Sequence, residues 1–165
     1  MKSLENFSII KVTTLAGYIL KNFGPMSHLK LQKLLYYCQA YHLANFKTVL
    51  FEEEFEAWVH GPVCRNVYDI IKGKSILYSD VTYSEYDFDS EIKLKDVVSS
   101  DQFNLLNDVL LPLSSWSGSE LETATHNEAP WIIARGEKKP NDNCSEIISK
   151  DEMLKYYTNE LNGWA

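Results

Sequence analysis

Residues 27–47 have the sequence SHLKLQKLLYYCQAYHLANFK, and this stretch without glycine or proline predicts one long helix. Ser27 is a suitable N-cap, because its hydroxyl can accept a hydrogen bond from an unpaired N–H group of the first turn. At about 100° per residue, apolar and aromatic side chains occupy two opposite sides of the helix. Narrow polar seams separate these sides and consist of Lys30, Gln32, Lys33 and Gln39. Since a helix with two apolar faces is normally covered on both, we expect a buried central helix.

Helical periodicity also appears on both sides of this stretch. The preceding helix is predicted to start at Ile9 and to end at the Gly24-Pro25 pair, which suits a helix C-terminus. Later helices are predicted from Pro62 to about Lys72, from Ser99 to about Leu113, from Ser117 to Ala129 and from Ser149 to about Gly163. The last three start with a serine that is followed three residues later by Gln or Glu, the spacing of a capping box.

The predicted β structure is short. Phe55, Ala57 and Val59 alternate with other residues in a connecting segment, which indicates a strand that ends at His60-Gly61-Pro62. Residues 74–98 are predicted as a loop with one short edge strand, residues 131–135 as a turn and residues 136–146 as a surface loop. The expected fold class is therefore mainly α with a minor short β element, a compact helical bundle around the central helix 27–47.

The length of 165 residues predicts a single domain, residues 1–165. Its core is expected to span residues 9–135, followed by a C-terminal loop and helix at residues 136–165. No run approaches 18 apolar residues and the N-terminus lacks the apolar core of a signal peptide, so we expect a cytoplasmic protein without a membrane partner.

The composition favours a protein-binding role. The net charge of -7 leaves no basic stripe for phosphates, so no direct nucleic-acid partner is expected, and a basic protein partner suits this charge. Aromatic residues make up 13% of the chain, and large side chains with polar tips serve binding surfaces as well as cores.

No motif predicts a catalytic residue, a metal site or a cofactor. The three cysteines are far apart, and the four histidines have none of the usual zinc spacings. A dyad of Cys64 with His60 or His126 is conceivable, because Cys64 is placed in the first turn of the predicted helix, where the helix dipole lowers a thiol pKa. The sequence around Cys64 shows no oxyanion hole, so a small residue beside a tight turn is the simpler interpretation.

Two segments place aromatic and hydrogen-bonding side chains at turns. Residues 52–63 are acidic, then aromatic, and end in a Gly-Pro pair, and residues 125–131 crowd polar groups before a tryptophan. Both suit polar side chains that satisfy free backbone groups, but both also suit a recognition surface. The candidate partner-binding residues are Trp58, His60, Gly61, Pro62, Val63, His126, Glu128 and Trp131.

Four segments carry a resemblance to a known family. The segments KLQKLLYYCQAYHLA (residues 30–44), LFEEEFEAWVHGPV (50–63) and VYDIIKG (67–73) resemble the Panacea domain of SocA-like antitoxins, which also occurs in phage-associated GepA-type proteins. THNEAPWIIAR (125–135) is similar to the later motif of the family, a histidine and an acidic residue before Pro-Trp. The resemblance covers most of residues 9–135 and does not extend to the last 30 residues.

The resemblance implies a helical antitoxin of a bacterial or prophage toxin–antitoxin system. Members neutralise different toxins, typically by direct protein contact, and the family implies no catalytic residues. Our first hypothesis is therefore an antitoxin that binds a cognate protein toxin. The alternatives are an adaptor that delivers the toxin to a AAA+ protease, with a protease or chaperone as second partner, and an enzyme that uses Cys64 or His126.

Overall fold

The computed structural model describes residues 7–71, 79–82 and 93–163. Within these residues the protein has eight helices and two antiparallel sheets of two strands each, which confirms the predicted fold class. The helices are α1 (Val12–Phe23), α2 (His28–Phe46), α3 (Arg65–Ile71), α4 (Leu94–Val97), α5 (Ser100–Leu113), α6 (Gly118–His126), α7 (Ala129–Arg135) and α8 (Lys150–Gly163). The strands are β1 (Met26–Ser27), β2 (Phe55–Trp58), β3 (Gly61–Cys64) and β4 (Asp80–Val81).

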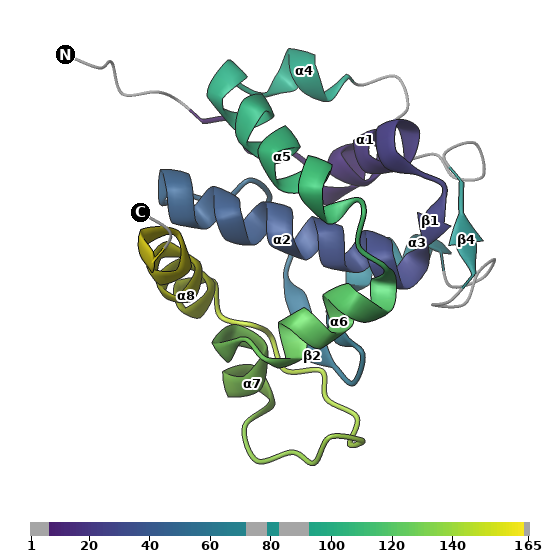
Figure 1. Cartoon of the computed structure of the whole chain (residues 1–165), viewed down its shortest axis with the longest axis vertical. Helices are drawn as coiled ribbons and strands as arrows, with labels where there is room; N and C mark the ends of the chain where they lie inside the picture. The colour runs from purple at the N-terminus through teal and green to yellow at the C-terminus, as the bar shows by residue number, and fades with distance from the viewer. Residues whose placement is uncertain (1–6, 72–78, 83–92, 164–165) are drawn as a thin grey trace.

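Helix α2 is the centre of the fold, as predicted. Ser27 caps its first turn by accepting a hydrogen bond of 3.1 Å from the backbone N–H of Lys30. Helices α1, α5, α6 and α8 and strand β3 all contact α2, and Figure 1 shows these elements arranged around it. Every residue from 31 to 40 is buried. A helix covered on all sides provides a rigid base for the elements that surround it.

The glutamines in the polar seams of α2 are buried and bind the backbone of other segments. The Gln32 side chain donates to the carbonyl of Cys64 (3.3 Å) and accepts from the N–H of Cys64 (2.8 Å). Two turns later, Gln39 donates to the carbonyl of Phe51 (2.6 Å) and accepts from the N–H of Leu50 (2.9 Å). Each glutamine amide thus makes the pair of hydrogen bonds that a neighbouring β-strand would otherwise make. It satisfies backbone N–H and C=O groups that would be costly to bury unpaired.

Strands β2 and β3 form a hairpin, where the sequence predicted a strand followed directly by a helix. Phe55 pairs with Cys64 and Trp58 with Gly61, so Pro62 lies in β3 and helix α3 starts only at Arg65. The outer edge of β2 is paired with the C-terminal segment, since the N–H of Ala57 donates to the carbonyl of Glu146 (2.9 Å). These long-range backbone bonds outweigh the local tendency of Pro62 to start a helix.

Two more element boundaries differ from the prediction. Residues 131–135, predicted as a turn, belong to helix α7, which starts beside Pro130 and is separate from α6. Helix α1 starts at Val12, three residues later than predicted. The capping boxes of Ser99 with Gln102 and Ser117 with Glu120 are both present, as the spacing predicted. Residues 74–98 were predicted as a loop with one short edge strand, and most of them lie outside the described residues. The described part contains strand β4, which pairs with β1, and helix α4, which the prediction lacked.

Candidate partner-binding site

The turn of the β2–β3 hairpin and the junction of α6 with α7 meet in space, and they bring most of the predicted site residues together. The indole N–H of Trp131 donates to the carbonyl of Trp58 across the two elements (2.9 Å). The ring of His126 stacks on Trp131, with 4.1 Å between ring centroids and 19° between planes. His60, in the hairpin turn, lies 3.1 Å from the carboxylate of Glu122 on α6. The two sequence segments therefore form one surface.

Gly61 allows the close approach of the hairpin to α2 and α6. Its φ of +98° is a backbone conformation that residues with a side chain rarely adopt. A Cβ atom at this position would lie 2.5 Å from Cε of Lys33 and 2.9 Å from Oγ1 of Thr125. Backbone conformation and packing therefore both require glycine here.

Lys33 lies beneath the hairpin turn and is completely buried. Its ammonium group donates to the carbonyl of Pro62 (3.1 Å). Burial lowers the pKa of Lys33 to about 7, and the carboxylate of Glu122 acts in the opposite direction. We therefore expect the charge of this side chain, directly below the candidate surface, to depend on pH near neutrality.

Arg135 fastens α7 to the hairpin and to the C-terminal loop. Its guanidinium donates to the carbonyl of Ala57 (2.9 Å) and to the carbonyls of Lys139 (2.9 Å) and Asp142 (2.8 Å). It also lies over the ring of Trp131, 5.0 Å from the centroid. A planar group with five donors suits this bridging position, and lysine would not replace it.

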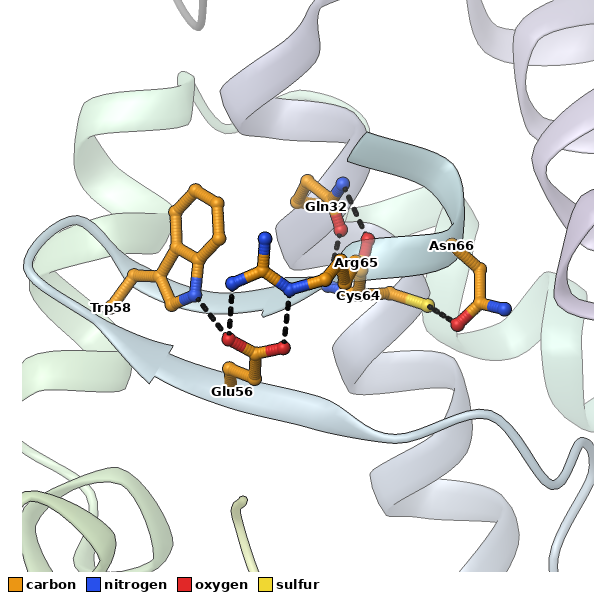
Figure 2. A network of polar contacts seen from close by, with 6 residues as sticks. All are labelled: Gln32, Glu56, Trp58, Cys64, Arg65 and Asn66. Carbon is orange, nitrogen blue, oxygen red and sulfur yellow. Dashed lines mark hydrogen bonds and ion pairs between the residues drawn. The ribbon is translucent and has the colours of Figure 1, made fainter. Parts of the chain in front are cut away.

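A polar network holds the outer face of the hairpin (Figure 2). The Arg65 guanidinium makes two hydrogen bonds of 2.8 Å to the carboxylate of Glu56, which also accepts from the indole N–H of Trp58 (2.9 Å). Arg65 lies 5.2 Å from the Trp58 ring centroid, and Tyr68 packs edge-on against the same ring. These contacts fix the orientation of the Trp58 side chain before any partner binds.

The Glu56→Gln substitution tests this network. Because hydrogen bonds to Arg65 lower the pKa of Glu56, the stability from this carboxylate is present above its unfolded pKa and lost as pH falls through the lowered value. We expect Glu56→Gln to reduce the free energy of unfolding by about 1–2 kcal/mol at neutral pH, and less in acid. Urea unfolding at several pH values measures this.

Glu54→Gln is the matched control, because Glu54 also pairs with a cation but is half exposed and joins Lys150 at the surface. We expect this exposed pair to contribute under about 1 kcal/mol. Equal losses of unfolding free energy in the Glu54 and Glu56 variants would show that the Glu56 network stabilises the hairpin no more than an exposed ion pair does.

The structure places the predicted site residues in different environments. Gly61, Pro62 and Val63 are buried, and Trp131 is almost fully covered. Trp58 and His60 are partly exposed beside the hairpin turn, and the side chain of His60 is 42% exposed. In this conformation a partner can therefore reach Trp58 and His60, while the buried members support them.

Glu128 lies apart from the other predicted residues. Its carboxylate accepts hydrogen bonds from the hydroxyls of Tyr37 and Tyr157, both 2.7 Å, and so joins α2 and α8. Burial raises its pKa, and the two tyrosine hydroxyls counteract the shift. The chain changes direction between α6 and α7, so Glu128 points away from His126 in spite of its position in the same motif.

Cys64 differs from the expectation of a thiol in the first turn of a helix. It ends strand β3 and is fully buried, and burial raises the pKa of its thiol to about 11. Its Sγ lies 3.9 Å from the side-chain oxygen of Asn66 (Figure 2). A protonated buried thiol is a poor nucleophile. No group of three or more potential metal ligands occurs among the described residues.

Sequence reasoning missed Gln32, Lys33 and Arg135, whose side chains bind the hairpin backbone. The sequence did contain a signal for Gln32 and Lys33. They belong to a helix with no polar face wide enough to be exposed to water, so their side chains must find hydrogen-bond partners inside the protein. Arg135 gave no such signal, because its partners come from segments far apart in the chain.

The fold and the site define a small helical domain in which the β2–β3 hairpin turn and the α6–α7 junction are joined into one surface. Residues 31–132 match the family model of the antitoxin SocA-like Panacea domain, and the chain belongs to this family. Membership supports an antitoxin-type role. No curated protein and no solved structure matches the chain. None of the helices in the described part of the chain is both long and apolar enough to cross a bilayer.

Proposed function

We propose that this protein is the antitoxin of a bacterial or prophage type II toxin–antitoxin system, and that it neutralises a cognate protein toxin by direct contact in the cytoplasm. Family membership supports the antitoxin role. The observation that carries the direct contact is the end of the hairpin, where partly exposed aromatic side chains lie on a base fixed by buried hydrogen bonds.

The accessible part of this surface contains a hollow of about 480 Å³ beside the hairpin turn. It is lined by Trp58, Val59, His60, Arg65, Asn143, Cys144 and Ser145. A well-packed aromatic side chain beside a hollow is the usual form of a binding hot spot, and a fixed side chain loses little entropy on binding. The net charge of -7 favours rapid encounter with a basic toxin.

The adjacent open reading frame provides the experiment. We expect its expression to stop growth, expression of this protein to restore growth, and the two proteins to co-purify. The His60→Ala variant should weaken co-purification about tenfold, and because the pair with Glu122 that it removes is partly exposed, its unfolding free energy should stay within about 1 kcal/mol of wild type. Lys155→Ala, at an exposed position on α8, is the control and should bind normally.

The outcome that contradicts the proposal is a wild-type protein that neither restores growth nor co-purifies. The toxin half-life in the same cells distinguishes blocking from delivery to a protease, since only delivery shortens it. Full binding by the His60→Ala variant would leave the antitoxin role standing and remove the hairpin turn as its contact surface.

A further inference from the structure

A second hollow, of about 570 Å³, lies on the other side of α6, between α2, α5, α6 and α8. Its apolar and aromatic lining consists of Tyr37, Tyr41, Leu105, Val109, Pro112, Leu113, Trp116, Leu121, Ala124 and Leu161. Trp116 is 41% exposed and Leu161 36% exposed, although both are large apolar side chains. An open groove between helices with such a lining is a typical site for an amphipathic helix.

The charges of this groove have one sign. Asp108, Glu128 and Glu160 contribute carboxylates to it, and no lysine or arginine is among the described residues that line it. Asp108 lies on α5 and Glu160 on α8, so two carboxylates come from opposite walls of the groove. A helix with cations on its flanks and apolar anchors on its inner face would match both the walls and the floor.

We infer that this groove binds a basic amphipathic helix of the toxin, with apolar side chains against Tyr41 and Trp116 and Lys or Arg facing the carboxylates of Asp108 and Glu160. The inference rests on the proposed function and adds a second contact surface to it. The hairpin turn contacts α6 through Glu122 and Thr125, whereas Leu121 and Ala124 of the same helix face the groove. A toxin that binds both the hairpin turn and the groove would contact the protein on two sides of α6.

The groove is tested first without the toxin, by two synthetic peptides of about 18 residues, a length at which an isolated helix is stable enough to study. Both carry the same leucine pattern, but one has lysines and the other glutamates on the polar face. Fluorescence anisotropy of labelled peptides should show that the lysine peptide binds and that salt weakens the binding, whereas the glutamate peptide should not bind.

Charge reversal locates the binding. Asp108→Lys should lower the affinity of the protein for the lysine peptide about tenfold or more. Glu137→Lys is the control, a charge reversal at an exposed position in the C-terminal loop, and it should change this affinity by less than about twofold. Trp116→Ala should also lower the affinity for this peptide, which would show that the apolar lining of the groove takes part in binding. Absence of lysine-peptide binding, or equal effects of the Asp108 and Glu137 reversals, would overturn the inference.

Growth rescue by the Asp108→Lys variant then connects the groove to the toxin. We expect this variant to lose rescue and the Glu137→Lys variant to retain it. Full rescue by Asp108→Lys overturns the assignment of the groove to the toxin but leaves the antitoxin proposal intact. Failure of the wild-type protein to rescue contradicts the proposed function instead, so the two failures are distinguishable.

Discussion

Replacing Gly61 by alanine is expected to lower the free energy of unfolding by about 2–6 kcal/mol, which is the sum of a backbone cost of about 1–3 kcal/mol and an overpacking cost of about 1–3 kcal/mol. The backbone cost arises because Gly61 has a φ of +98°. The overpacking cost arises because the new Cβ would lie 2.5 Å from Cε of Lys33. The Lys33 side chain is itself fully buried and bonded to Pro62, so it has little freedom to move away.

Urea unfolding followed by circular dichroism measures the loss, and Gly136→Ala is the matched control. Gly136 also has a positive φ, of 58°, but a Cβ there would meet nothing within 4 Å. The control therefore carries only the backbone cost, about 1–3 kcal/mol. If Gly61→Ala loses no more stability than Gly136→Ala, the close approach of the hairpin to Lys33 and Thr125 imposes no overpacking cost, and packing does not require glycine at this position.

The same substitution should also reduce toxin neutralisation at temperatures where the variant remains folded. The new Cβ would press on the side chains of Lys33 and Thr125. Because Lys33 is buried and bonded to Pro62, we expect part of the adjustment to displace the hairpin, and with it Trp58 and His60, relative to α6. The Gly136 variant should neutralise normally, since a Cβ at Gly136 would meet no neighbouring atom within 4 Å and therefore displaces nothing at the hairpin turn. A folded Gly61→Ala protein with unchanged toxin affinity would indicate that the toxin does not use this surface.

Local signals in the sequence predicted the helices well. Ser27, Ser99 and Ser117 each cap the helix that their spacing indicated, because a cap depends only on residues within one turn. The two apolar faces of residues 27–47 predicted its central position for a similar reason. A helix without a wide polar face has no arrangement in which water can cover it, whatever its neighbours are.

The hairpin and its supports could not be predicted in this way. Pro62 is an equally good first residue of a helix and a tolerated residue in a short strand, and its position in β3 depends on pairing with Ala57 and on Gln32. The same limit applies to the polar residues of α2. A lysine or glutamine between two apolar faces has the same spacing whether it meets water or the backbone of a distant segment.

The candidate site was predicted as two sequence segments, and the structure explains why only part of them forms one surface. His126 and Glu128 are two residues apart, but α6 ends at His126 and α7 begins at Ala129, so the chain turns between them. His126 consequently stacks on Trp131 beside the hairpin, while Glu128 binds Tyr37 and Tyr157 on the opposite side. A motif in sequence is here divided between two surfaces of the molecule.

The Lys33→Met variant should remove a pH dependence of stability that wild type shows between about pH 7 and pH 9. Burial lowers the pKa of Lys33 to about 7 in the folded protein, against an ordinary value of 10.5. In this window the unfolded chain binds more protons than the folded protein, so the free energy of unfolding of wild type rises with pH. The gain from about pH 7 to pH 9 should be about 2 kcal/mol, since each unit of full proton difference contributes about 1.4 kcal/mol.

Methionine has a similar length but no titrating group, and it leaves the carbonyl of Pro62 without its donor. That loss costs about 1–3 kcal/mol and does not depend on pH, so it shifts the whole curve of the variant without changing its slope. The quantity to measure is therefore the difference in unfolding free energy between wild type and Lys33→Met at several pH values, because the other titrating groups largely cancel in it. Burial lowers the pKa of His28 and of His126, and the charge of Lys33 acts on both in the same direction, so the comparison starts at pH 7 to keep these histidines neutral. A difference that stays constant up to pH 9 would show that Lys33 remains charged beneath the hairpin and that the folded protein compensates for its burial.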